Sequence, residues 1–335
     1  MSKRYRRRRR RYYVSPMMIL GAVLLAAAVI LLLVFRKPAK DPADKTADDP
    51  QPPQQQTDGQ PQTPETKKPL TAKTADGMTC TLTDLGEDAV HTGELILVNN
   101  WTAYQFPEEQ DLVCILENSN GNYIVRDYSV YLSPVAMDAL NDMMADFRAQ
   151  GGSKTVNVVA GYRTAEDQQG LYDRSAERNG KEHADKYVAK PGGSEHHTGY
   201  VVDFSIRNAD GTSADYDGTG EYAWINENCC NYGWVVRYDQ AKAELTGIYD
   251  EPWHFRYVGI PHATKMAELG LCLEEYIDYL KDYTFEGEHL VIECAEGTYE
   301  AWYAEGSKTY LPISGSYQVS GNNVDGVIVT YQVKK

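Results

Sequence analysis

Apolar residues in the middle of the chain recur at helical spacing between two clear boundary signals. The segment opens with Ser133-Pro134 and closes with the glycines at 151 and 152. Serine at the N-cap with proline at the first helical position favours a helix start, and paired glycines favour a helix end. The apolar stripe between them predicts a helix with one buried face; it consists of Ala136, Leu140, Met143, Met144 and Phe147.

Further helices and strands follow from the same patterns on both sides of this segment. A second helix is predicted from Thr164 to about residue 179, because Asp167 lies at capping-box distance from Thr164. Short β-rich or apolar runs predict strands. Strands are expected at 93–99, 112–116, 156–160, 234–238 and 253–258, and further helices at 224–232 and 262–283. These elements predict a folded domain over residues 76–283.

The residue composition of the chain changes after residue 284. Short runs rich in Thr, Tyr and Val are broken by glycines at intervals of about ten residues. This spacing is typical of a small all-β unit, and we predict such a module over 284–335. Its sequence leaves open whether it packs on the preceding domain or binds cell wall or another protein.

The N-terminal region combines a basic run with an uncharged apolar one. Residues 17–35 would span about 28 Å as a helix at ~1.5 Å per residue, close to the roughly 30 Å of a bilayer core. A signal peptide has a shorter apolar region and a cleavage site of small residues, whereas this run ends in Phe35-Arg36-Lys37-Pro38. We expect a single-pass membrane anchor, with the basic tail 1–16 in the cytoplasm and everything after the anchor outside the cell.

Residues 36–75 predict a spacer between this anchor and the folded domain. Eight of the fifteen prolines lie between positions 38 and 73, among Asp, Gln, Thr and Lys. Such a composition buries too little apolar surface to offset the loss of chain entropy on folding. We expect a disordered, partly extended tether that lets the domain sweep the space above the membrane.

Charge and cysteine content narrow the classes of partner. The net charge is -15, although residues 1–37 carry ten basic residues and no acidic one. The folded part is therefore strongly acidic, and nucleic-acid binding, which requires a basic surface, is not expected. All six cysteines follow the anchor, where an oxidising compartment permits disulfides. One to three bridges or buried thiols both fit, and the sequence does not fix the connectivity.

Two short segments carry the chemistry. The run S-E-H-H-T-G-Y-V-V-D at 194–203 and the run E-P-W-H at 251–254 together supply imidazoles and carboxylates. Catalytic zinc is held by three protein ligands and keeps a fourth position for water or substrate. His196, Asp203 and His254 could fill the three ligand positions, with Glu251 beside them as a base. His197 is a rival to His196, because spacing alone does not choose between the two.

The same segments resemble a known family. The run 194–203 resembles the S-x-H-x-x-G-x-x-x-D signature of the VanY-like zinc D-alanyl-D-alanine carboxypeptidases of the LAS superfamily. Gly161-Tyr162-Arg163-Thr164, followed by Gln168, looks like the G-Y-R-S helix opening of that family. The segments 231–238, 246–247 and 251–259 match its C-terminal half almost continuously. The resemblance covers about residues 90–275, with mild departures such as Cys229-Cys230 where Asn-Ala is usual.

Carried over position by position, this resemblance implies a complete active site. It implies His196, Asp203 and His254 as Zn²⁺ ligands and so favours His196 over His197. Glu251 corresponds to the general base and later acid, and Arg163 to the cation that faces the developing oxyanion. Ser194 and Gln168 match positions that bind substrate. The implied fold is α+β, a small antiparallel sheet flanked by helices.

The resulting expectation is a membrane-anchored enzyme that removes the terminal D-alanine from peptidoglycan stem peptides. Relatives of the same superfamily include D,D-dipeptidases, L,D-carboxypeptidases and endopeptidases, which remain alternatives. A catalytically inactive wall-binding protein is a further alternative, but it would have no need of Glu251. A serine-type peptidase would require an S-x-x-K motif; Ser175 is instead followed by Ala, Glu and Arg.

Overall fold

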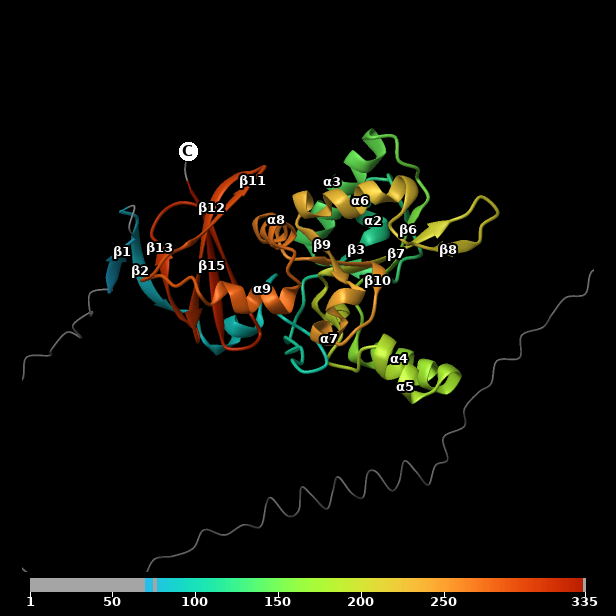
Figure 1. Cartoon of the computed structure of the whole chain (residues 1–335), viewed down its shortest axis with the longest axis horizontal. Helices are drawn as coiled ribbons and strands as arrows, with labels where there is room; N and C mark the ends of the chain where they lie inside the picture. The colour runs from blue at the N-terminus through green and yellow to red at the C-terminus, as the bar shows by residue number, and fades with distance from the viewer. Residues whose placement is uncertain (1–69, 75–76, 334–335) are drawn as a thin grey trace, which may run out of the picture. The chain divides into compact units, whose positions relative to one another are not determined.

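The computed structural model describes residues 70–74 and 77–333, and a six-stranded sheet lies among helices in the right half of Figure 1. Its strands lie in the order β4-β6-β7-β10-β9, with β8 paired to β7. All pairs are antiparallel except β4 with β6. The strands are β4 (Ile124–Val125), β6 (Val156–Ala160), β7 (Val201–Arg207), β8 (Ser213–Asp215), β9 (Trp234–Tyr238) and β10 (Glu251–Tyr257). The fold is therefore mixed α/β, and the predicted antiparallel sheet contains one parallel pair.

Helices pack on this sheet, and the two with the clearest sequence signals form as predicted. Thr164 accepts a hydrogen bond from the Asp167 N–H at 3.1 Å and caps its helix. Helix α3 inserts Leu140, Met144 and Phe147 into a core shared with Val202 and Phe255; each such side chain contributes about 1.5–3 kcal/mol on burial. The helices of this part are α2 (Ile115–Asn118), α3 (Pro134–Ala149), α4 (Ala165–Asn179), α5 (Lys181–Tyr187), α6 (Ala223–Asn228) and α7 (Ala243–Thr246).

The prediction of a strand at residues 93–99 is wrong. The segment is buried at Leu95 to Val98 but belongs to no strand ladder. Its backbone partners come from distant parts of the chain: the Leu97 N–H donates to the Asn322 carbonyl (3.1 Å), and the Ile96 carbonyl accepts from Arg256 (3.0 Å). An apolar run does not reveal whether its backbone groups will be satisfied by a neighbouring strand or by side chains and loops.

Other predicted boundaries shift. The strand expected at 112–116 is the two-residue β3 (Val113–Cys114), which pairs with β5 (Tyr131–Leu132) and runs into α2. The single helix expected at 262–283 is two helices, α8 (Ile260–Leu269) and α9 (Leu273–Leu280). Gly270 adopts a left-handed conformation with φ 64° and ends α8, as glycine commonly does after a helix.

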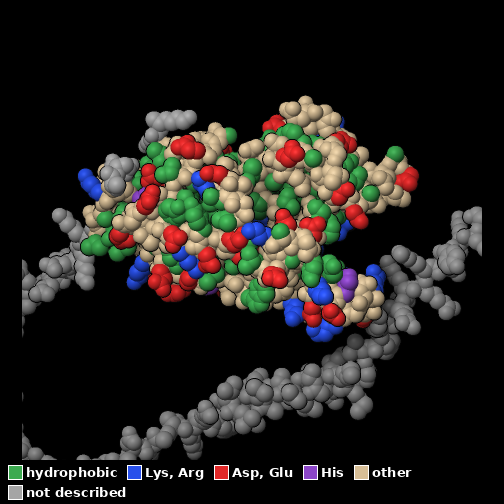
Figure 2. Space-filling view, in the orientation of Figure 1, with side chains coloured by type: hydrophobic (Ala, Val, Ile, Leu, Met, Phe, Trp, Pro, Cys, Tyr) green, Lys and Arg blue, Asp and Glu red, His purple; other side chains and the backbone are tan. Residues whose placement is uncertain are grey.

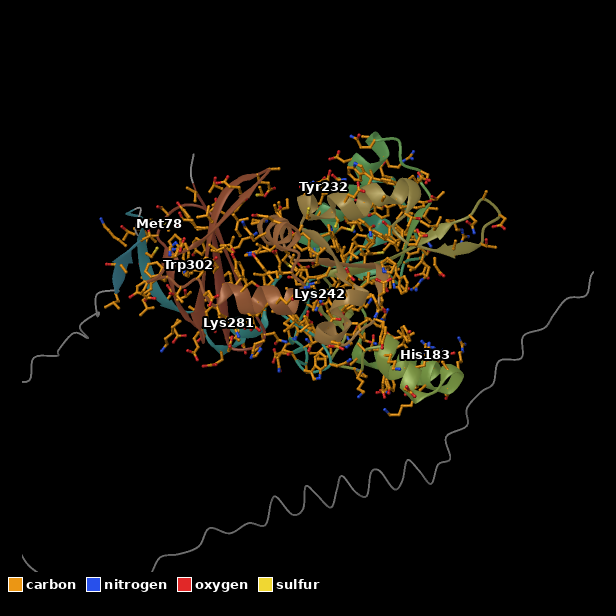
Figure 3. All side chains as sticks on the ribbon, in the orientation of Figure 1. Met78, His183, Tyr232, Lys242, Lys281 and Trp302 are labelled. Carbon is orange, nitrogen blue, oxygen red and sulfur yellow. The ribbon has the colours of Figure 1, made fainter. Side chains whose placement is uncertain are left out.

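The C-terminal part is all-β, as its composition predicts. A four-stranded sheet has the order β11-β12-β15-β14, and Trp302, labelled in Figure 3, is fully buried in its core. The strands are β11 (Leu290–Cys294), β12 (Gly297–Glu305), β13 (Lys308–Pro312), β14 (Tyr317–Gly321) and β15 (Gly326–Gln332). Strand β13 pairs instead with β2 (Thr79–Asp84), so the two sides of the expected boundary at 284 share a sheet.

The N-terminal predictions fall mostly outside the described residues. The basic tail 1–16, the anchor 17–35 and nearly all of the spacer 36–75 lie there. Over 70–74 and 77–333, no helix combines the length and apolarity needed to cross a bilayer. One correction applies at the end of the spacer, where Thr71–Lys73 forms strand β1 against β2. The three residues Thr71-Ala72-Lys73 at the end of a Pro-rich tract give no strand signal, because their partner β2 supplies the pairing.

Surface charge and thiols follow the composition. Figure 2 shows acidic side chains spread over one face, with basic ones placed among them rather than gathered into a patch.

Among the cysteines, Cys114, Cys229 and Cys272 are buried thiols, and Cys230 and Cys294 are partly exposed thiols. Three of these five residues therefore agree with the buried-thiol alternative, while Cys230 and Cys294 are free thiols that are not fully buried.

His262 joins the helices that follow β10 to the C-terminal sheet. Its Nδ1 lies 2.9 Å from the Tyr276 hydroxyl on α9, and its Nε2 lies 2.7 Å from Thr330 Oγ1 on β15. The ring is buried, and burial lowers the pKa of His262 to about 3. The folded protein therefore keeps this imidazole neutral at pH values where the unfolded chain, with an ordinary pKa of 6.5, takes up a proton.

Because its folded-state pKa is depressed, His262 makes the free energy of unfolding fall as the pH drops from 6.5 toward about 3. We expect His262→Phe to lower stability by about 1–3 kcal/mol at neutral pH, since two buried hydroxyls lose a partner. We also expect the difference between the two proteins to shrink in acid. Urea unfolding between about pH 8 and about pH 4 measures it. His183→Phe, at an exposed histidine labelled in Figure 3, is the control. A pH-independent difference for His262→Phe would contradict this role.

Candidate metal centre and active site

Strand pairing brings two of the predicted ligands together. In the antiparallel pair β7–β10, Asp203 lies directly opposite His254. His196 precedes β7 on the short 3-10 helix η2 (Glu195–Thr198), and the chain turns back through Gly199 with φ 72°. This left-handed conformation favours glycine, and a Cβ at Gly199 would lie 2.7 Å from Leu112 Cδ2 and displace the Leu112 side chain.

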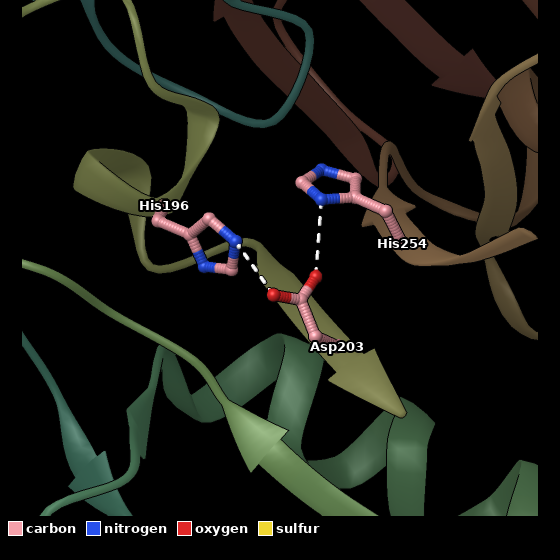
Figure 4. Close-up of side chains that lie close together, drawn as sticks. All are labelled: His196, Asp203 and His254. Atoms are coloured by element: carbon pink, nitrogen blue, oxygen red, sulfur yellow. Dashed lines mark ion pairs between the residues drawn. The ribbon is translucent and has the colours of Figure 1, made fainter. Parts of the chain in front are cut away.

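The three side chains converge on one point (Figure 4). His196 Nε2 lies 3.2 Å from Asp203 Oδ2, and His254 Nδ1 lies 3.1 Å from Asp203 Oδ1. One ligand atom from each residue lies within 4.8 Å of the others. Two imidazole nitrogens and a carboxylate form a donor set that zinc binds in catalytic sites. The residues present therefore fit a zinc ion.

Backbone contacts fix the orientation of His196. Its Nδ1 lies 2.6 Å from the Gly161 carbonyl, which leaves Nε2 to face Asp203. The Arg163 N–H donates to the His196 carbonyl at 3.1 Å. These two contacts join the G-Y-R segment to η2. The Gly161 carbonyl also fixes the tautomer and orientation of the His196 ring, as such carbonyl groups do for metal-binding histidines.

His197 is excluded as the ligand by its own contacts. Its Nδ1 lies 2.7 Å from the Arg163 carbonyl, and its Nε2 accepts a hydrogen bond from the Gly192 N–H at 3.1 Å. Both ring nitrogens are therefore engaged in holding loops together. The structure agrees with His196, the residue that the family resemblance favours.

Glu251 reaches the same pocket through an irregularity in β10. Alternate residues of a regular strand face opposite sides, so Glu251 and His254, three positions apart, would point away from each other. The register against β9 shifts between Glu251 and Phe255, and Glu251 Oε2 lies 3.6 Å from His254 Nδ1. Glu251 is the first residue of β10, so the strand predicted over 253–258 begins two residues earlier, and the irregularity turns Glu251 toward the pocket.

Burial and charge shift the proton affinities of these groups. Burial raises the pKa of Glu251 to about 7, with His254 opposing and Asp203 adding to the shift. For His254, burial lowers the pKa, but the neighbouring carboxylates of Asp203 and Glu195 outweigh burial and raise the pKa to about 9. His196 and His254 overcome the effect of burial on Asp203 and hold its pKa well below the ordinary value. A carboxyl that titrates near neutrality can accept and return a proton.

Arg163 is held at the pocket by Gln168. Gln168 Oε1 accepts from Arg163 Nη1 at 2.8 Å, and Gln168 Nε2 donates to the Ala189 carbonyl at 2.6 Å. Burial lowers the pKa of the guanidinium, while Asp203 and Glu251 favour its charge. Gln168, which the resemblance places near substrate, thus has both ends of its amide engaged in positioning Arg163.

One small pocket contains every predicted site residue. Its volume is about 100 Å³, and aromatic and aliphatic side chains such as Tyr187, Ile248 and Trp253 form part of its wall. The site residues that line it are Arg163, Gln168, Ser194, His196, Asp203, Glu251 and His254. Glu195 and Tyr238 also line it, and the sequence motifs did not single them out. The only sequence signal for Glu195 is that it is one of two acidic residues in the run 194–203.

Comparisons with known proteins agree with this geometry. Residues 129–260 match the VanY family model, described as D-alanyl-D-alanine carboxypeptidase. A D-alanyl-D-alanine carboxypeptidase of Enterococcus faecium is 33% identical over 250 residues, which cover 73% of this chain and 77% of that protein. A bifunctional D-Ala-D-Ala dipeptidase and carboxypeptidase of Enterococcus gallinarum, VanXYC, is 36% identical over 157 residues, 46% of this chain and 81% of that protein.

A solved structure extends the similarity to the fold. The vancomycin resistance D,D-dipeptidase VanXYg, in complex with a D-Ala-D-Ala phosphinate analogue, superposes with a TM-score of 0.67 at 32% identity. The alignment covers 75% of this chain and 98% of that one.

The contacts of the two adjacent histidines predict opposite effects on metal binding. His196→Ala removes a ligand, and we expect zinc affinity to fall by at least about 100-fold. His197→Ala breaks two loop contacts but leaves the three ligands, so we expect lower thermal stability with zinc affinity within about tenfold of the original. Competition with a chromophoric chelator measures both affinities. Loss of zinc binding in His197→Ala, with retention in His196→Ala, would reverse the assignment.

Proposed function

The chain belongs to the VanY family of D-alanyl-D-alanine carboxypeptidases, and we propose that it is a membrane-anchored, zinc-dependent member acting on peptidoglycan stem peptides outside the cell. Its D,D-carboxypeptidase activity follows from the family, with a relative of that activity matched over 77% of its length. The observation that carries the zinc-dependent mechanism is the convergence of His196, Asp203, His254 and Glu251 on a single pocket.

The metal requirement rests on the donor set. A zinc ion held by His196, Asp203 and His254 would polarise the scissile carbonyl and lower the pKa of a water molecule from 15.7 to about 7. The Asp203 carboxylate faces one nitrogen of each imidazole at 3.1–3.2 Å, an arrangement that suits a metal-binding site. The small pocket leaves room beside these ligands for the end of a peptide.

Glu251 moves the proton. Glu251 is the first residue of β10, its carboxylate lies beside His254, and burial raises its pKa to about 7. As the carboxylate it takes a proton from the attacking water, and as the acid it gives that proton to the amine of the departing D-alanine. One group can serve both steps because its pKa lies near the working pH.

Arg163 supplies positive charge to the same pocket. Its guanidinium is fixed by Gln168, which is itself tied to the Ala189 carbonyl. A fixed charge stabilises the developing oxyanion without the reorganisation that a mobile side chain or water would require. Gln168 therefore contributes through Arg163.

A dipeptidase activity on free D-Ala-D-Ala is the second candidate. It is favoured by the similarity to the bifunctional enzyme of Enterococcus gallinarum, whose name includes both activities. A stem-peptide substrate suits a protein tethered by residues 17–35, because free dipeptide in the cytoplasm would lie on the other side of the membrane from the active site.

Substrate preference and the role of Glu251 can be tested together. We expect release of D-alanine from a pentapeptide ending in D-Ala-D-Ala, slower reaction with the free dipeptide, and no reaction with the tetrapeptide, followed by mass spectrometry. Glu251→Gln should retain zinc and lose about 10²–10⁴-fold in kcat. Asp250→Asn, at the exposed neighbouring residue, is the control. Hydrolysis of the free dipeptide alone would reject the carboxypeptidase proposal, and full activity of Glu251→Gln would reject the mechanism.

The membrane anchor predicts a change of fraction on truncation. In cell lysates we expect the full chain in the membrane pellet, released by detergent but not by high salt, because residues 17–35 are long enough to span a bilayer. A chain that begins at Pro38 should be soluble with unchanged kcat and KM on the pentapeptide. Recovery of the full chain in the soluble fraction, or a mature N-terminus after residue 35, would contradict the anchor.

A further inference from the structure

Glu195 is a fully buried carboxylate next to a proposed ligand. It begins η2, and its side chain has 0% exposure. Its Oε1 accepts from Arg237 Nε at 2.8 Å and lies 3.2 Å from Arg256 Nη1. Burying a carboxylate without compensation is strongly unfavourable. The two guanidinium groups outweigh burial and hold the pKa of Glu195 far below its ordinary value, so it is charged.

The second oxygen of Glu195 faces the metal centre. Its Oε2 lies 3.5 Å from His254 Nε2. Among the described residues, neither of these two buried atoms makes a hydrogen bond within ordinary geometry. Buried polar groups are rarely left unpaired. We therefore regard each of these two atoms as the hydrogen-bond partner of the other.

The arginines that hold Glu195 are themselves fixed by outer segments. Arg237 Nη2 donates to Glu274 on α9 at 2.7 Å, and Asn99 Nδ2 donates to the same carboxylate oxygen at 3.1 Å. Arg256 Nη2 donates to the carbonyls of residues 94 and 96. These anchoring segments lie outside the stretch 129–260 that matches the family model. The position of Glu195 is thus set by parts of the chain beyond the signature motifs.

We propose that Glu195 is a positioning residue for the metal centre: its Oε2 accepts a hydrogen bond from His254 Nε2–H and so directs His254 Nδ1 toward Asp203 and the metal. The Gly161 carbonyl acts on His196 in the same way. The two imidazoles are then fixed by opposite nitrogens, His196 binding through Nε2 and His254 through Nδ1. The inference rests on the proposed zinc site, in which His254 is a ligand.

A carboxylate partner also changes the ligand chemically. It holds the proton on Nε2, so that Nδ1 carries the free lone pair, and it increases the electron density that the ring offers a cation. Loss of such a partner typically weakens metal binding about 10- to 100-fold. A carboxylate that served only to neutralise Arg237 and Arg256 would have no such effect, which separates the two roles.

The test compares Glu195→Asp and Glu195→Gln with Glu274→Gln. Glu195→Asp keeps the charge for both arginines but withdraws the oxygens from His254 by one methylene, whereas Glu195→Gln removes the charge. Glu274→Gln disturbs the same arginine network from α9 without touching His254. Zinc affinity by chelator competition, the visible spectrum of the Co²⁺-loaded protein and the thermal midpoint of the metal-free protein are measured for each.

We expect both Glu195 variants to bind zinc about 10- to 100-fold more weakly, with altered Co²⁺ absorption. Glu274→Gln should lower the thermal midpoint but leave zinc affinity within about threefold. Equal zinc affinity in all variants, or an equal loss in Glu274→Gln, would overturn the inference. If Glu195→Gln does not fold, Glu195→Asp decides the question. Absence of zinc binding in the unaltered protein would instead reject the proposed function.

Discussion

The antiparallel pairing of β7 with β10, in the register that sets Asp203 opposite His254, is the constraint on which the site depends. A slip of one residue would turn His254 to the other face of the sheet and separate the two side chains. The remaining groups are placed by departures from regular structure on either side of this pair. The Gly199 turn brings His196 back over the end of β7, and the bulge at the start of β10 turns Glu251 into the pocket.

The site contains several buried charged side chains, and each buried carboxylate is surrounded by groups that can carry positive charge. Asp203 is surrounded by two imidazoles, while Glu195 behind His254 is surrounded by two arginines. Buried charges of this kind contribute little net stability and are retained where function requires a defined geometry. Apolar packing supplies the stability instead, through α3 on one side of the sheet and through the core shared by α8, α9 and the C-terminal strands. The catalytic part packs against the C-terminal part, and hydrogen bonds from His262 and from the segment 94–99 connect the two.

Local signals made much of this structure predictable. Ser133-Pro134 and the capping box at Thr164 located α3 and α4, and the S-x-H and E-x-x-H motifs pointed to the residues of the candidate metal site and to Glu251. The split of the expected helix 262–283 has a local cause in Gly270. The failures at 93–99 and at the N-terminal strand arose instead because partners distant in sequence decided the outcome. The apolar run 93–99 finds its hydrogen bonds in Asn322 and Arg256 rather than in a strand, and β1 pairs with β2, which itself pairs with β13 from the other end of the chain. Glu195 lies inside the recognised motif, but its significance depends on Arg237 and Arg256, which a motif does not reveal.

The central claim is that three side chains from η2, β7 and β10 form one zinc site in which His254 binds through Nδ1. The most direct measurement is a crystal structure of the zinc-soaked protein with anomalous differences recorded on both sides of the zinc absorption edge. This account predicts a single strong peak about 2.0–2.2 Å from His196 Nε2, an Asp203 carboxylate oxygen and His254 Nδ1. A peak bound to His197, or no peak among these three residues in a protein that still hydrolyses the pentapeptide, would contradict it.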